Sequence, residues 1–467
     1  MNNPYLELDR AMLGDIYTTT EPMDNLIMLC DEFGSRTPGT PDERAAADFL
    51  RGKLEAYGLE NARLEPFQHN AWRRGPTSLH IEKPFQKEIP CIALPYCPPT
   101  DLTAPLVLLP DGGPASFERA AERLKGGIAA VSSAPPSDVN RVVHRTEMYE
   151  RSALAGAVGF VFIGMYEGRG PETGSVGGDR EGLIPGFSIG HEDAEFLRRQ
   201  EARLGPLTAR LRADCATYPS ESWNIVAEIP GETDEIVMIG SHHDGHDIAQ
   251  GAMDPASGVV SVLEAARVLA KHAKDKLRRT ARFIFWSCEE IGLTGAYRHA
   301  EATADELDKV RFLLNCDAAG GSGGKGVILN QLKELEPLFE AYEKQMGDAP
   351  FGQKTHAFSD HYPYFLRGVP TAYVGNPRGR FTGRGWGHTA YDTVDKLELR
   401  HLWAASALAA RIVLRAASEE NWPARRRAPE EIEEIMRQEP DLVDMRAVSD
   451  AYDQLCEERQ ADGKGAS

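Results

Sequence analysis

The sequence has fewer basic than acidic residues, no long apolar run and no recognisable export signal. No stretch reaches the roughly 18 consecutive apolar residues that a membrane-spanning helix needs, so no membrane span is expected. The opening segment MNNPYLELDRAMLGD has no basic stretch followed by an apolar one, so no secretory signal is expected. The 52 lysines and arginines against 71 aspartates and glutamates give a net charge of −19. Such a surface repels nucleic acid and anionic membranes, so we expect neither as a partner.

Cysteines are also few. The seven of them are scattered from Cys30 to Cys456, with no CxxC pair and no spacing typical of a disulfide framework. We therefore predict reduced thiols and a cytoplasmic protein. The 467 residues show no internal repeat, and 42% hydrophobic and 26% charged residues are ordinary for a soluble globular chain of two or three domains.

The chain divides into four segments of different texture. Residues 1–72 begin an α/β domain, whereas residues 73–217 are rich in proline, glycine and short β-like runs, which indicates a small inserted β/α domain. An α/β pattern resumes over residues 218–418, where ARFIFWS is a nearly continuous apolar run typical of a strand buried on both faces. Residues 419–467 form a charged tail that we predict to be partly helical and frayed at its end.

Within the first segment, a helix is predicted directly after Thr40. Threonine is a good N-cap, Pro41 suits the first helical position, and Glu43 completes a capping box. Apolar residues follow with a helical period, and Gly58 is a natural stop.

Histidine and acidic residues gather at the ends of predicted strands or in the loops that follow them. In an open α/β sheet, ligands bind in the crevice beyond the carboxyl ends of the strands. So many carboxylates cannot all stay ionised in one partly buried site unless cations compensate them. Mixed histidine and carboxylate ligation suits zinc, with cobalt or manganese as substitutes. The residues concerned are His242, Asp244, Asp254, Glu289, Glu290, Asp317 and His388.

The order of the motifs points to a family. The series GSHHD, GAMDPASG, CEEIGLTGA, NCD, SDHYPYFLRGVP and GHTAYDT closely resembles the di-zinc aminopeptidase and glutamate carboxypeptidase family of co-catalytic metallopeptidases, over roughly residues 22–415. The resemblance implies a three-layer α/β/α sandwich with a central mixed, mostly parallel sheet. It also implies two Zn²⁺ ions per chain, for which Co²⁺ or Mn²⁺ can substitute, and peptide substrates; a homo-oligomer is compatible with the sequence.

The resemblance assigns a role to each metal ligand by its motif. His242 and Asp317 would hold one ion, and Glu290 and His388 would hold the other. Asp254 would bridge both ions through its two oxygens.

Two further acidic residues receive roles from the same resemblance. Glu289 would be the general base that deprotonates the attacking water, and Asp244 would fix the imidazole of His242. In the resembled family a cis peptide bond follows the bridging aspartate, and Pro255 makes this geometry cheap because X–Pro bonds cost only about 0.5–1 kcal/mol in the cis form.

Several neighbours are interpreted as bystanders. His243, His246 and Asp247 crowd the first ligand and are interpreted as polar loop residues, with direct contact to metal or substrate as the alternative. Cys288 and Cys316 flank the acidic residues and are interpreted as small core filler.

The motif SDHYPYF leaves two questions open. His361 is a candidate for supporting a ligand or contacting substrate, and either Tyr362 or Tyr364 is a candidate oxyanion donor.

The predicted reaction is hydrolysis of peptide bonds at a chain end, most simply by an aminopeptidase. Arg378, Arg380 and Arg384 could instead grip a substrate carboxylate, as in a carboxypeptidase or dipeptidase, although we interpret their loop as solvated. A one-zinc glutaminyl cyclase is a second reading, and the inserted segment argues against it. The runs LKGGIAAVSS, ERSALAGAVGFVFIG and IPGFSIG in that segment resemble a protease-associated domain. A non-catalytic receptor or scaffold is the third reading, and it conflicts with the presence of all five ligands and the base.

Overall fold

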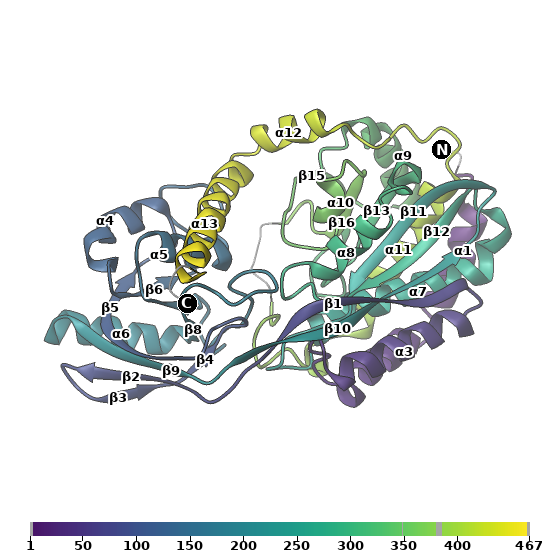
Figure 1. Cartoon of the computed structure of the whole chain (residues 1–467). Coiled ribbons are helices and arrows are strands. Elements are labelled where there is room, and N and C mark those ends of the chain that lie inside the picture. Colours follow the sequence, from purple (N-terminus) through teal and green to yellow (C-terminus); the bar gives the residue numbers. More distant parts are fainter. Residues whose placement is uncertain (1–2, 348, 380–384, 465–467) are drawn as a thin grey trace. The chain divides into compact units, whose positions relative to one another are not determined.

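The computed structural model describes residues 3–347, 349–379 and 385–464 (Figure 1). The chain forms two compact units. Unit 1 comprises Met1–His69 and Ser220–Ile435, and unit 2 comprises Asn70–Pro219 and Met436–Ser467. The sequence of unit 1 is therefore interrupted by that of unit 2.

Unit 1 is built on a mixed sheet with the strand order β1-β10-β12-β11-β13-β16-β14-β15. Its centre is parallel, because β11 pairs in parallel with both β12 and β13, and β13 pairs in parallel with β16. Strands β10 and β14 flank this centre in antiparallel orientation. The strands are β1 (Glu60–Arg73), β10 (Ala216–Ile229), β11 (Thr233–His242), β12 (Arg279–Trp286), β13 (Val310–Asn315), β14 (Gly326–Leu329), β15 (Phe351–Gln353) and β16 (Thr371–Gly375).

The central strands are buried on both faces, as their apolar runs predicted. Alternate side chains of a strand point to opposite faces of a sheet. In β11, Val237 and Ile239 join one hydrophobic cluster, whereas Ile236 and Met238 join another. Each face of the sheet therefore has its own core.

Helices cover both of these faces, which confirms the predicted three-layer α/β/α fold. Side chains of α1, α2, α3, α7, α9 and α11 pack in the first cluster. Side chains of α8 and α10 pack in the second. The helices are α1 (Leu6–Ile16), α2 (Glu21–Ile27), α3 (Pro41–Ala56), α7 (Ser257–Ala273), α8 (Thr294–Ala302), α9 (Glu336–Met346), α10 (Tyr362–Phe365) and α11 (Leu399–Ser418).

The predicted start and stop signals of α3 are confirmed. The hydroxyl of Thr40 accepts a hydrogen bond from the backbone N–H of Glu43 at 3.3 Å, and Pro41 is the first helical residue. The Glu43 carboxylate accepts from the N–H of Gly39 at 2.7 Å, one residue before the N-cap. Gly58 follows the helix with a φ of +83°, a left-handed conformation that glycine adopts without a Cβ clash.

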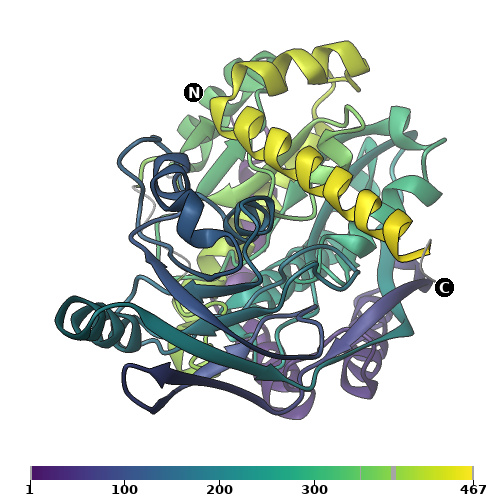
Figure 2. The same ribbon diagram turned by 60° about the vertical axis from the view of Figure 1, so that its left-hand side comes forward.

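Unit 2 contains a second mixed sheet, with the strand order β3-β2-β9-β5-β6-β7-β8-β4. Its strands β5 to β8 run parallel to one another. The helix α13 of the C-terminal tail packs against α5 within this unit (Figure 2). The strands are β2 (Thr77–Lys83), β3 (Lys87–Ile89), β4 (Cys91–Ala93), β5 (Thr100–Leu109), β6 (Ile128–Ser132), β7 (Gly159–Ile163), β8 (Gly186–Ile189) and β9 (Leu207–Ala213).

The remaining helices account for the predicted helical character of the tail and of the inserted segment. They are α4 (Pro114–Leu124), α5 (Arg145–Leu154), α6 (His191–Leu204), α12 (Pro429–Gln438) and α13 (Pro440–Lys464). Over the residues that the structure describes, no helix combines the length and apolar character needed to cross a membrane.

Candidate metal centre

The three parallel strands β12, β11 and β13 end side by side. His242, the last residue of β11, pairs with Trp286 of β12, and Gly240 of β11 pairs with Asn315 at the end of β13. The residues that follow these ends therefore emerge at one edge of the sheet. This edge is where ligands bind in open α/β sheets.

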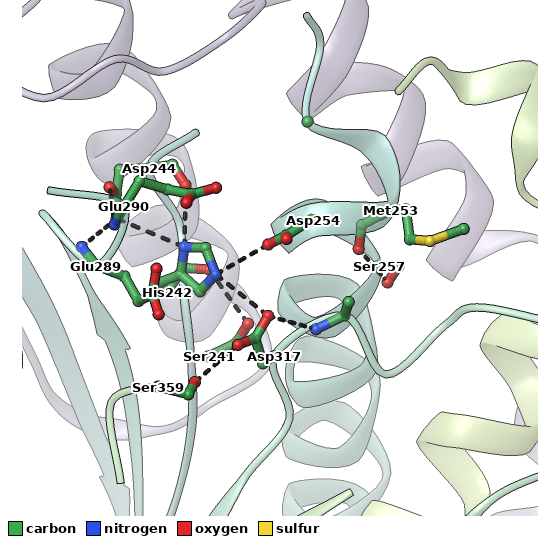
Figure 3. Close-up of polar contacts among 12 residues, drawn as sticks. Ser241, His242, Asp244, Met253, Asp254, Ser257, Glu289, Glu290, Asp317 and Ser359 are labelled. Carbon is green, nitrogen blue, oxygen red and sulfur yellow. Dashed lines mark hydrogen bonds and ion pairs between the residues drawn. The ribbon is translucent and has the colours of Figure 1, made fainter. Parts of the chain in front are cut away.

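One set of donors consists of His242, Asp254 and Asp317 (Figure 3). The Nε2 atom of His242 lies 3.2 Å from Asp254 Oδ1 and 3.3 Å from Asp317 Oδ1. Two ligands on a tetrahedral zinc ion, with bonds near 2.0–2.1 Å, are separated by about 3.3 Å. The spacing of these atoms therefore fits a cation held between them.

A second set of donors adjoins the first. His388 Nε2 lies 3.4 Å from Asp254 Oδ2 and 3.4 Å from Glu290 Oε2. These separations also fit a tetrahedral cation. The two oxygens of Asp254 thus face different donor sets, and the five residues predicted as ligands come together around two adjoining positions.

The electrostatics of the centre favour cations. Burial alone would lower the pKa of His242, but its acidic neighbours, with Glu289 and Asp317 first among them, together outweigh burial and raise the pKa well above its usual value. The cluster therefore stabilises positive charge even on a fully buried imidazole.

The loop that carries Asp254 is fixed by a residue that no sequence argument singled out. Asp392 accepts hydrogen bonds from the backbone N–H groups of Met253, at 2.7 Å, and Asp254, at 3.1 Å. The Asp254–Pro255 peptide bond is cis, as predicted. Asp392 lies in the quoted motif GHTAYDT, so the motif contained the signal although no role was assigned to it.

Asp244 supports the centre in more ways than the predicted one. The closest acceptor to His242 Nδ1 is the backbone carbonyl of Asp244, at 3.0 Å, whereas its carboxylate lies 3.6 Å away. The carboxylate instead accepts hydrogen bonds from the N–H groups of Glu289, at 3.0 Å, and Glu290, at 3.3 Å. Asp244 therefore holds the turn that presents the predicted base and a predicted ligand, in addition to orienting His242.

Glu289, the predicted base, interacts with carboxylates of the same centre. Burial raises the pKa of its carboxyl well above the usual value, and the neighbouring carboxylates of Glu290 and Asp317 add to this effect. A carboxylate with a raised pKa is better matched to accepting a proton near neutral pH.

Asp317 is oriented by a buried polar chain behind it. The hydroxyl of Ser359 donates to Asp317 Oδ2 at 2.7 Å, and the side-chain amide of Asn315 donates to that hydroxyl at 2.6 Å. His361 lies fully buried at 3.3 Å from the same amide, so of its two predicted roles the supporting one fits its position.

Other candidates are directed away from the centre. The hydroxyl of Tyr364 lies 2.7 Å from His299 and accepts a hydrogen bond from the Trp286 indole at 3.1 Å. This fully buried phenol belongs to the core of the sheet, so its candidacy as oxyanion donor was wrong. His243 points its Nε2 to the carbonyl of Trp223 at 3.0 Å, and burial lowers its pKa to about 4, so it is a neutral structural residue.

The two cysteines near the acidic motifs fit their predicted role as core filler. Cys288 and Cys316 are fully buried, and burial raises the pKa of both thiols. Neither belongs to the donor sets described above.

The arginines upstream of His388 are only partly described. Arg378 forms an ion pair with Glu343 of α9, which is a competing partner for any substrate carboxylate. Arg380 and Arg384 lie outside the described residues.

The bystander interpretation of His246 was wrong. Its Nε2 lies 2.8 Å from Glu290 Oε2, and its side chain is 6% exposed. With Glu290 and His388 it forms a group whose donor atoms lie close enough together to hold a cation, so the imidazole lies at the second donor set. The contact between residues 246, 290 and 388 forms only when segments far apart in the sequence pack together, so no local sequence pattern indicated it.

The fold and the two donor sets together define a metal-dependent hydrolase built on an α/β/α sandwich. Residues 224–413 match the sequence model of Peptidase family M28. The protein is accordingly a metallopeptidase.

Proteins named as peptidases match most of the chain. The sequence is 28% identical to human carboxypeptidase Q over 336 residues, which cover 68% of this chain and 70% of that protein. It is 26% identical to leucine aminopeptidase 2 from Arthroderma otae over 365 residues, which cover 75% of this chain and 69% of that protein.

Solved structures share the fold. The crystal structure of a Peptidase M28 precursor from Shewanella amazonensis superposes with a TM-score of 0.77 at 24% identity, covering 90% of this chain and 98% of that chain. A zinc aminopeptidase from Bacillus subtilis gives a TM-score of 0.67 at 24% identity, covering 86% of this chain and 96% of that chain. The shared fold thus extends beyond the residues that match the family model.

Proposed function

We propose that this protein is an aminopeptidase that removes residues from the N-terminus of peptides with the help of two zinc ions. The observation that carries the proposal is the position of Asp254, whose Oδ1 lies 3.2 Å from His242 Nε2 and whose Oδ2 lies 3.4 Å from His388 Nε2. A carboxylate that faces two donor sets in this way is suited to bridging two cations.

Zinc suits these donors best. Each position offers one imidazole nitrogen together with carboxylate oxygens, a combination that zinc binds in tetrahedral geometry and that cobalt or manganese can also accept. Two cations, when bound, would lower the pKa of the attacking water and polarise the scissile carbonyl. The zinc aminopeptidase of the same fold is in line with this choice.

The protein's own groups then carry the proton. The carboxylate of Glu289 takes a proton from the attacking water and passes it to the nitrogen of the leaving amine. Asp244 holds the backbone at Glu289 in place because it accepts from the N–H of this residue at 3.0 Å. Ser359 does the same for Asp317 through a hydrogen bond of 2.7 Å.

The balance of charge favours a substrate with a free amino end. The side chains around the two donor sets are predominantly acidic, and they are those of Asp244, Asp254, Glu289, Glu290, Asp317 and Asp360. Opposite charges attract at short range, so this acidic surrounding favours an ammonium group over a carboxylate. Leucine aminopeptidase 2 is a relative with this polarity.

Cleavage from the carboxyl end is the second candidate, because carboxypeptidase Q is also a relative. Mass spectrometry of a mixed peptide pool separates the two polarities. We expect ladders that shorten from the N-terminus in the presence of the zinc-loaded protein, and no ladders with the metal-free protein or with Glu289→Gln. Loss from the C-terminus, or cleavage of dipeptides alone, would overturn the aminopeptidase proposal.

The two remaining readings are tested with the same protein, by its metal content and by its peptide products. A metal content near one ion per chain, together with cyclisation of N-terminal glutamine peptides, would identify a glutaminyl cyclase. A zinc-loaded protein that hydrolyses no peptide would be a scaffold on a peptidase fold. The protease-associated character of residues 73–217 and the cytoplasmic location stay predictions.

A further inference from the structure

His246 lies in the loop after β11 and contacts two of the predicted ligands at once. Its Nε2 is 2.8 Å from Glu290 Oε2 and 3.2 Å from His388 Nδ1. The rings of His246 and His388 meet edge to face, with centroids 4.6 Å apart and an interplanar angle of 65°. Both imidazoles are buried, with side chains 6% and 7% exposed. Hydrogen-bonding atoms and ring packing thus fix their relative orientation.

The atoms involved place His246 behind the ligands. His388 turns its Nε2 toward Asp254, at 3.4 Å, and its opposite nitrogen, Nδ1, toward His246. The separation of 2.8 Å between His246 and Glu290 is a hydrogen-bond distance and is shorter than the roughly 3.3 Å between two ligands on one tetrahedral ion. His246 therefore contacts His388 at the nitrogen opposite the one that faces the bridging carboxylate. It contacts Glu290 at the oxygen that also faces His388.

The first donor set is supported in another way. There, the ring of His242 is oriented by the backbone carbonyl of Asp244, at 3.0 Å from Nδ1. Asp317 in that set is 31% exposed, whereas Glu290 in the second set is 4% exposed. A side-chain imidazole thus encloses the second set, whereas a backbone carbonyl orients the imidazole of the first set.

We propose that His246 is a positioning residue for the second cation, acting through both Glu290 and His388. The proposal rests on the two-cation function proposed above. Residues that orient metal ligands typically change metal affinity 10–100-fold when they are removed. Because His246 contacts ligands of one set, its removal is expected to weaken one of the two cations and to spare the other.

The test is a cobalt titration of the metal-free protein, followed by visible absorption and by calorimetry. We compare the wild-type protein with His246→Phe, which keeps an aromatic ring against His388 but has no nitrogen, and with His246→Ala. The matched control is His272→Ala, which removes an imidazole from the end of α7, where it pairs with Asp15 at 2.8 Å. Thermal unfolding of each variant establishes that it is folded.

In both His246 variants we expect the affinity for one of the two cobalt ions to fall about 10–100-fold. The visible absorption that this ion produces should change, and that of the other ion should not. The other affinity should stay within about threefold of the wild-type value, and His272→Ala should match the wild-type protein. If His246→Phe bound both cations with wild-type affinity, the proposal would be overturned, because an aromatic ring without nitrogen atoms would then be enough to position the ligands. Equal weakening of both cations would overturn it as well. A wild-type protein that binds fewer than two cations would contradict the proposed function itself, which is a separate outcome.

Discussion

Arg36 donates its Nε–H to the backbone carbonyl of His243 at 2.8 Å, although the two residues are 207 positions apart in the sequence. The same guanidinium donates to the carbonyls of Gln250, at 2.8 Å, and Gly251, at 3.0 Å. It also donates to the carbonyl of Leu29 at 3.1 Å. This fully buried cation therefore ties the loop after β11, which leads to Asp254, to the N-terminal part of the chain.

Substitution of Arg36 by methionine is expected to destabilise unit 1. Hydrogen bonds to charged groups contribute roughly 1.5–3 kcal/mol each, so the loss of several should lower the unfolding free energy by at least about 3 kcal/mol. Chemical denaturation measures this change. The control Arg10→Met removes an exposed ion pair with Glu7 and should cost less than about 1 kcal/mol. Equal stability of the two variants would show that the buried hydrogen bonds contribute little.

Glu289→Gln is expected to remove the base and to leave the cation sites intact. The turnover rate should fall by about 10²–10⁴, the usual contribution of general acid–base catalysis. The amide keeps the size of the side chain, so metal content measured by elemental analysis should match the wild-type protein. A fall in rate of less than tenfold, or loss of bound metal, would contradict the assignment of Glu289 as the base.

Asp254 and Asp317 are expected to differ in how many cations depend on them. Asp254 faces both donor sets, whereas Asp317 belongs to the first. Asp254→Ala should therefore weaken both cations, and Asp317→Ala should weaken one. Titration of the metal-free variants distinguishes the two patterns. If Asp254→Ala retained one cation at its wild-type affinity, the bridging role would be wrong.

Glu43 makes stability depend on pH. Burial raises the pKa of its carboxyl from the usual 4.5 to about 8. Between these values the folded protein holds a proton that the unfolded chain releases, so the unfolding free energy falls as pH rises through this window. The slope from this group is at most about 1.4 kcal/mol per pH unit.

The variant Glu43→Gln lacks this proton and keeps the size of the side chain. Its unfolding free energy relative to the wild-type protein should therefore rise between pH 5 and pH 8, which denaturation at several pH values measures. Other titrating groups are common to both proteins and cancel in the comparison. Parallel pH profiles for the two proteins would contradict the raised pKa.

The elements of unit 1 were predictable because their signals are local. The apolar run ARFIFWS became β12, buried on both faces, and the capping residues Thr40 and Pro41 mark the start of α3. Four of the predicted ligands also follow from local order, because they lie at or shortly after a strand end or just before a helix. The fifth, His388, lies in the long loop between β16 and α11 and was found by its motif. The position of a residue relative to a strand or helix can be read from the sequence. Residues after neighbouring parallel strands then meet at one edge of the sheet.

The second layer of contacts was decided by the tertiary structure. Tyr364 and His246 are both polar side chains close to motif residues, yet one packs in the core of the sheet and the other lies against Glu290. Asp392 and Arg36 both contact the Asp254 loop, although they lie near opposite ends of the sequence of unit 1. The direction of a side chain depends on which distant segment packs against it, and hydrophobic periodicity contains no information on that pairing.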